Sequence, residues 1–218
     1  MKRIYFYVLA CLLMLVGCQN LLEEQIVTDE LPSELYAEFA DDTKVQLNSA
    51  TQTVWTEDDE ISVFYKNDAN GRWLFMGKTG ARGGALTCQD PGTSTTKMDK
   101  VVVLYPYSES YALDIEKQTV GVNIPSTQYY EKGSYGVGGN IMVSVGTTGS
   151  ISLQSVCGWL KVQLSGSGRV TKVTFEGNSK EQVAGDATLN YGDLSLKLLS
   201  GGGGLGDDFS LGGELVFG

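Results

Sequence analysis

The five residues Val101-Val102-Val103-Leu104-Tyr105 are apolar without interruption, and they decide the fold. Successive side chains of a β-strand point to opposite faces of its sheet. A strand that is apolar at each position is therefore covered on both faces. Pro106 predicts the end of this strand, because proline has no N–H to donate to a neighbouring strand. We expect a central strand at residues 101–105, with protein on either side of it.

Around this strand, the chain repeats the period of two that is typical of half-buried strands. Asp68-Ala69-Asn70-Gly71 predicts a tight hairpin between residues 61–65 and 72–76, and Glu116-Lys117-Gln118 predicts a second hairpin. No amphipathic helix pattern follows the first eighteen residues. The other expected strands are at residues 35–39, 45–47, 85–88, 111–115, 120–124, 141–145, 151–153, 156–164, 170–175, 183–189 and 194–199. Short strands at this spacing indicate an all-β protein of sandwich type.

The amino-terminal residues are typical of a secretory signal. Lys2 and Arg3 precede an apolar run at residues 4–16, which is too short to span a bilayer permanently. The run ends in Leu15-Val16-Gly17-Cys18, which resembles the lipobox of bacterial lipoproteins. We expect cleavage between Gly17 and Cys18 and attachment of lipid to the Cys18 thiol. The alternative is an ordinary signal peptide with an incidental cysteine.

The lipid would hold the protein at a membrane, because two or three acyl chains are enough for stable anchoring. Glu23 and Glu24 follow closely, and they resemble the acidic tether that directs some lipoproteins of the Bacteroidota to the outer face of the outer membrane. A solvated linker is the alternative interpretation. The sequence therefore predicts an outer membrane lipoprotein at the cell surface.

Composition limits the partners and the chemistry. Without Lys2 and Arg3, 14 of the 16 basic residues remain against 26 acidic residues, a net charge of −12. Such a charge repels nucleic acid, which we exclude as a partner. The chain has no histidine, which excludes histidine-based acid–base catalysis, serine or cysteine triads, and most zinc or copper sites. We expect no enzyme activity and no cofactor.

Two cysteines remain in the mature chain besides Cys18, in a compartment that permits disulfides. Cys88 and Cys157 both occur within strand-like apolar runs. We favour two buried thiols over a disulfide between them.

Acidic runs suggest hydrolase or calcium sites, and we interpret them as solvated turns. The four carboxylates Glu57-Asp58-Asp59-Glu60 are consecutive, so they cannot all face one ion. Asp41-Asp42 and Asp207-Asp208 are interpreted in the same way, and no two acids are spaced to suggest a glycosidase pair. We therefore assign no catalytic and no metal residues.

Aromatic residues are interpreted as core and rim positions, with a sugar-stacking platform as the alternative. Trp55, Trp73 and Trp159 are expected in the core. The tyrosines that could form the platform are Tyr105, Tyr107, Tyr111, Tyr129, Tyr130 and Tyr135.

The strand pattern fades at the carboxyl end, where eight of the last eighteen residues are glycine. Only some six strands are visible after residue 140, against about seven in a complete sandwich. We therefore expect an incomplete second sandwich. The expected organisation is a signal peptide at 1–17, a lipidated tether at 18–34, a first β-sandwich at 35–139, a partial second β-sandwich at 140–200 and a glycine-rich tail at 201–218.

Several segments resemble the fimbrillin-like lipoproteins of the Bacteroidales, in the order found in that family. They are a tryptophan and acidic run ahead of a strand at residues 54–64, Tyr105-Pro106-Tyr107, Ile124-Pro125-Ser126-Thr127-Gln128, and residues 157–164 followed by 170–178. The resemblance implies two tandem transthyretin-like β-sandwiches. It also implies a role in fimbrial assembly, anchoring or cell adhesion, in which fimbrial subunits join by strand addition.

Two features depart from that family. The family is cut after an arginine behind the tether, but here no basic residue lies between Cys18 and Lys44. The glycine-rich end would be a weak donor strand, because glycine leaves side-chain pockets empty. Both departures favour an anchor-type subunit or a monomeric surface protein over a stalk subunit. The alternative function is a carbohydrate-binding surface lipoprotein associated with glycan uptake.

Overall fold

The computed structural model describes residues 30–40, 53–129, 138–147, 149–158, 164–175, 182–199 and 213–216, the last four as backbone only. These residues form fourteen strands and no helix, so the all-β prediction is confirmed. Accordingly, this part of the chain contains no helix with the length and apolarity needed to cross a bilayer.

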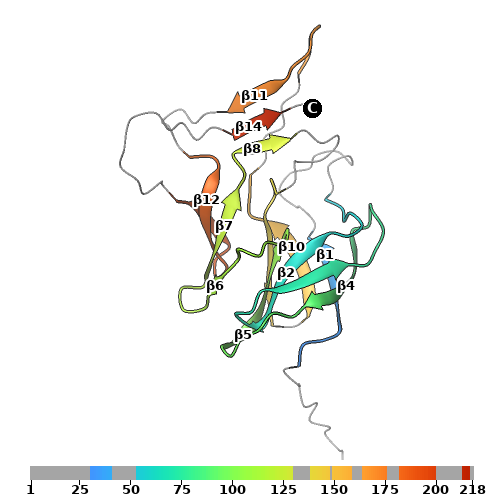
Figure 1. Cartoon of the computed structure of the whole chain (residues 1–218), viewed down its shortest axis with the longest axis vertical. Helices are drawn as coiled ribbons and strands as arrows, with labels where there is room; N and C mark the ends of the chain where they lie inside the picture. Colours follow the sequence, from blue (N-terminus) through green and yellow to red (C-terminus); the bar gives the residue numbers. More distant parts are fainter. Residues whose placement is uncertain are drawn as a thin grey trace, which may run out of the picture. The chain divides into compact units, whose positions relative to one another are not determined.

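Seven strands form a sheet that closes into a barrel (Figure 1). Around the barrel the order is β1, β10, β9, β5, β2, β3, β4, and only the β1–β10 pair is parallel. The strands are β1 (Glu34–Phe39), β2 (Glu60–Asn67), β3 (Gly71–Phe75), β4 (Gly83–Asp90), β5 (Lys97–Tyr105), β9 (Met142–Gly146) and β10 (Ser150–Ser155). Strands from both sides of position 140 therefore share one sheet.

The predicted central strand is β5, which is buried on both faces. Val101 and Val103 belong to the cluster inside the barrel, which we name the inner core. Val102 and Leu104 belong to a second cluster outside it, the outer core. The inner core consists of Leu35, Ala37, Phe39, Trp55, Ile61, Val63, Trp73, Phe75, Leu86, Val101, Val103, Met142, Ile151 and Leu153. This burial on both faces explains why residues 101–105 are apolar without interruption.

A four-stranded sheet covers one face of the barrel. Its order is β13, β12, β7, β6, from β6 (Leu113–Asp114), β7 (Thr119–Ile124), β12 (Gly185–Asn190) and β13 (Ser195–Leu198). Barrel and sheet share the outer core, which consists of Phe64, Val102, Leu104, Tyr111, Leu113, Val120, Val122, Ile141, Val143, Ala187, Leu189 and Tyr191. The sheet therefore packs over the outer sides of β2, β5 and β9.

The third sheet has three strands, which Figure 1 shows side by side. β14 (Gly213–Val216) lies between β11 (Lys172–Phe175), to which it is antiparallel, and β8 (Thr127–Tyr129), to which it is parallel. A strand within the glycine-rich tail was not expected, because the side-chain pattern there is weak.

Both predicted hairpins are confirmed, as β2–β3 and β6–β7. The strand expected at residues 45–47 lies outside the described residues. Of the strand expected at 156–164, residues 156–158 and 164 are not in a strand, and the rest is outside the described residues.

Candidate functional site

The predicted lipidation and cleavage residues, Gly17 and Cys18, lie outside the described residues, as does the tether up to residue 29. Their roles therefore stay predictions. The described chain offers two other features with functional potential. One is the strand that closes the barrel, and the other is a cavity beside it.

The closing strand is β1. It pairs with β4 on one side, with Tyr36 opposite Ala85, and with β10 on the other side, with Tyr36 opposite Ser150. Without β1, the remaining six strands would form an open sheet with edges at β4 and β10. Such edges offer unpaired N–H and C=O groups to any strand that can replace β1.

The inner side chains of β1 fill the barrel. Leu35, Ala37 and Phe39 are at most 5% exposed, whereas Tyr36 between them is 56% exposed. Burying a leucine or phenylalanine side chain contributes about 1.5–3 kcal/mol each. A replacing strand would therefore need apolar residues at the same alternating positions.

An aromatic stack joins β1 to the rest of the barrel. The Phe39 and Trp55 ring centroids are 4.6 Å apart, and those of Trp55 and Phe75 are 4.7 Å apart. Trp55 and Trp73 are fully buried, which confirms their core prediction; Trp159 lies outside the described residues.

The run Glu57-Asp58-Asp59-Glu60 forms a turn that leads into β2, as interpreted from the sequence. The Thr56 N–H donates to Asp59 Oδ2 at 2.7 Å, and the Tyr105 hydroxyl donates to Asp59 Oδ1 at 3.3 Å. Burial raises the pKa of Asp59, and these hydrogen bonds oppose the rise. Among the described residues, no group of three or more acids or cysteines is placed to hold a metal ion. Asp41, Asp42, Asp207 and Asp208 lie outside those residues.

Four of the tyrosines considered for a stacking platform lie in the described part of the chain, and these four do not gather in one place. Tyr105 packs against the inner core, whereas Tyr111 belongs to the outer core. Tyr107 lies beside Arg72, with the guanidinium carbon 6.0 Å from its ring centroid, and Tyr129 is exposed in β8. Tyr130 and Tyr135 lie outside the described residues.

Cys88 and Cys157 are free thiols, so the preference against a disulfide is confirmed. Both are partly rather than fully buried, because Cys88 packs at the margin of the inner core and Cys157 at that of the outer core. Burial raises the pKa of both thiols. They are therefore mainly protonated at neutral pH and are poor nucleophiles.

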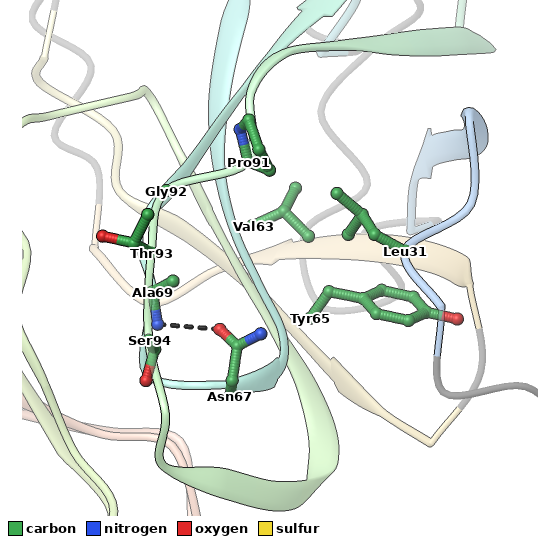
Figure 2. A pocket seen from close by; sticks show the side chains of 9 residues that line it. All are labelled: Leu31, Val63, Tyr65, Asn67, Ala69, Pro91, Gly92, Thr93 and Ser94. Atoms are coloured by element: carbon green, nitrogen blue, oxygen red, sulfur yellow. Dashed lines mark hydrogen bonds between the residues drawn. The ribbon is translucent and has the colours of Figure 1, made fainter.

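A half-open cavity of about 300 Å³ lies beside the end of β2. It is lined by Leu31, Val63, Tyr65, Asn67, Ala69, Pro91, Gly92, Thr93 and Ser94. Figure 2 shows Leu31 and Tyr65 on one side, the residues of the 91–94 loop on the other, and Val63 between them. Sequence analysis missed this site, because its walls come from three separate segments. The only local signal was the turn at residues 68–71.

Comparison of the chain with protein-family models, curated proteins and solved structures found no match.

Proposed function

We propose that this chain is a non-enzymatic, lipid-anchored surface protein of fimbrillin type, acting in fimbrial assembly, anchoring or cell adhesion. The observation that carries the proposal is the position of β1 between β4 and β10. In the sequence, β1 is separated from its neighbour β2 by residues 40–59, and the two strands do not pair with one another. A partner strand with alternating apolar residues would then take its place by backbone pairing.

The proposal includes two tandem transthyretin-like sandwiches, at the outer face of the outer membrane. The packing of a four-stranded sheet on the barrel supports layered β packing, whereas β9 and β10 join the barrel from beyond the proposed boundary at residue 140. The lipid on Cys18 would fix the module to the cell. Because no lysine or arginine lies between Cys18 and Lys44, the chain would keep this lipid and serve as an anchor-type subunit.

A reversible lock on β1 tests strand replacement. Tyr36 and Ala85 are opposed across β1 and β4, and opposed residues of antiparallel strands are near enough for a disulfide. The double variant Tyr36→Cys with Ala85→Cys would be made in the full chain, and its assembly would be followed on unboiled gels. We expect ladders of higher-order species from the reduced protein and their loss after oxidation.

The control is the single variant Tyr36→Cys, which has no partner at position 85 and should assemble equally with and without reductant. Ladders of equal strength from the oxidised and reduced double variant would count against strand replacement. Wild-type protein without any ladder would count against self-assembly.

A further inference from the structure

The cavity beside β2 has an apolar side. Leu31 and Tyr65 are half buried, and their exposed parts form this side, whereas Val63 lies beneath them in the inner core and is only 1% exposed. Ala69 and Pro91 extend this surface at the cavity margin. An apolar surface with one aromatic ring favours a ligand that has an apolar face of its own.

The cavity also has a polar side, formed by Asn67, Thr93 and Ser94. The Asn67 Oδ1 atom accepts a hydrogen bond from the Ala69 N–H at 2.8 Å, which Figure 2 draws as a dashed line. This bond orients the amide, whose nitrogen is a further donor. The Ser94 hydroxyl donates to Asp68, whereas Thr93 adds a hydroxyl that can donate and accept.

The backbone fixes both polar groups. A β-bulge lies between Tyr65 and Asn67, where Lys66 has a φ of 54°, and bulges commonly re-aim side chains next to functional sites. Gly92 has a φ of 65°, and a side chain there would lie 3.1 Å from the Ala69 Cβ atom. The 91–94 loop therefore packs tightly on the β2–β3 turn.

No lining residue carries a charge. A charged ligand would lose hydration in the cavity without gaining an opposite charge. A wholly apolar ligand would leave the donor nitrogen of the half-buried Asn67 amide without a partner. These conditions favour a neutral ligand with one apolar face and several hydroxyl groups.

We propose that this cavity binds one neutral pyranose ring of a glycan. The C–H face of the ring would lie toward Tyr65 and Leu31, and its hydroxyls would face Asn67 and Thr93. A volume near 300 Å³ is at the lower end for small-molecule sites, so one ring would enter and the rest of a glycan would extend through the open side. Leu31 lies three residues before β1, so the cavity is complete only while β1 keeps its place in the barrel. Glycan binding is therefore tested on the unassembled chain, and its failure would leave strand replacement at β1 standing.

Saturation-transfer NMR on the full chain in detergent micelles would test it. The probes are the methyl pyranosides of glucose, galactose, mannose and N-acetylglucosamine, with methyl glucuronide as a charged analogue. We expect saturable binding of at least one neutral glycoside and weaker binding of the glucuronide. Tyr65→Leu and Thr93→Val should each weaken the binding by about tenfold, since each removes one aromatic or hydrogen-bonded contact.

Matched controls are Tyr36→Leu, an exposed tyrosine on β1, and Thr95→Val, in the same loop but outside the cavity lining. Both should bind like wild type, and melting temperatures would show that all variants fold. Absence of binding by all four neutral glycosides would overturn the proposal. Equal binding by Tyr65→Leu and Thr93→Val, or tighter binding of the glucuronide, would overturn it as well.

Discussion

Two aspartates show that the environment of a single residue decides how its charge affects stability. Asp59 is half buried in the turn before β2, whereas Asp114 is the last residue of β6, where its side chain faces the exposed turn that follows. Burial raises the pKa of Asp59. Hydrogen bonds from Lys117, whose Nζ atom lies 2.7 Å from Asp114 Oδ2, lower the pKa of Asp114. The two carboxyl groups should therefore affect the pH dependence of folding in opposite directions.

Asp59→Asn should change this pH dependence in a defined direction. The raised pKa means that the folded wild type binds a proton more tightly than the unfolded chain. Its free energy of unfolding therefore falls as the pH rises from 3.8 through the raised pKa, and the variant lacks that fall. Urea unfolding from about pH 3 to pH 7 would measure the free energy of unfolding of both proteins. We expect the stability of the variant relative to wild type to increase as the pH rises.

Asp114→Asn is the matched comparison, because the lowered pKa reverses the sign. Wild type gains stability from Asp114 above pH 3.8 and loses it as the pH falls through the lowered pKa. The free energy of unfolding of Asp114→Asn, relative to that of wild type, should therefore decrease as the pH rises. If the relative stability of both variants changed with pH in the same direction, the opposite pKa shifts of Asp59 and Asp114 would be contradicted.

At the level of single residues, the sequence predicted a solvated turn in the acidic run 57–60, because four consecutive carboxylates cannot all face one ion. It did not identify Asp59 as the partly buried acid. The contact with Tyr105, which donates to the Asp59 carboxylate, could not be read from the sequence, because the two residues are 46 positions apart.

Among the elements, β5 gives the sharpest test of the layered packing. Val103 faces the inner core and Val102 the outer core, and both are at most 1% exposed. Val102→Ala and Val103→Ala should each lower the free energy of unfolding by roughly 2 kcal/mol, from lost burial and a residual cavity. Urea unfolding of the two variants would measure these costs.

Val54→Ala serves as the reference. Because Val54 is 41% exposed, this substitution should lower the free energy of unfolding much less. A near-neutral Val102→Ala would mean that the four-stranded sheet does not cover β5. The uninterrupted run 101–105 predicted double coverage, because the pattern is local. The identity of the covering strands is not local, since β7 and β12 pair with one another over some sixty intervening positions.

For the whole molecule, we propose that a lipid on Cys18 determines where the barrel resides. Cells grown with labelled palmitate should incorporate label into the wild-type chain and none into Cys18→Ala, because the thiol carries the lipid. Gel autoradiography and membrane fractionation would measure both. An unlabelled wild-type chain would count against the anchor, whereas label that remains in Cys18→Ala would place the lipid elsewhere.

The molecular architecture was only partly predictable. Side-chain alternation gave the all-β class and most strands, including β1 at residues 34–39. Closure into a barrel was not visible, because it depends on the register between Tyr36 and Ser150. The cavity was hidden for the same reason, since Leu31, Tyr65 and Thr93 meet only in the folded chain.

The parallel pairing of β1 with β10 also bears on export. If the predicted secretory signal directs export, the chain crosses the inner membrane with its amino end first, and β1 arrives well before Ser150 and its neighbours. Until then, Leu35 and Phe39 face water with one edge of their strand unpaired, which is a condition that promotes aggregation. We therefore expect the half-translocated chain to depend on a periplasmic chaperone that holds apolar segments.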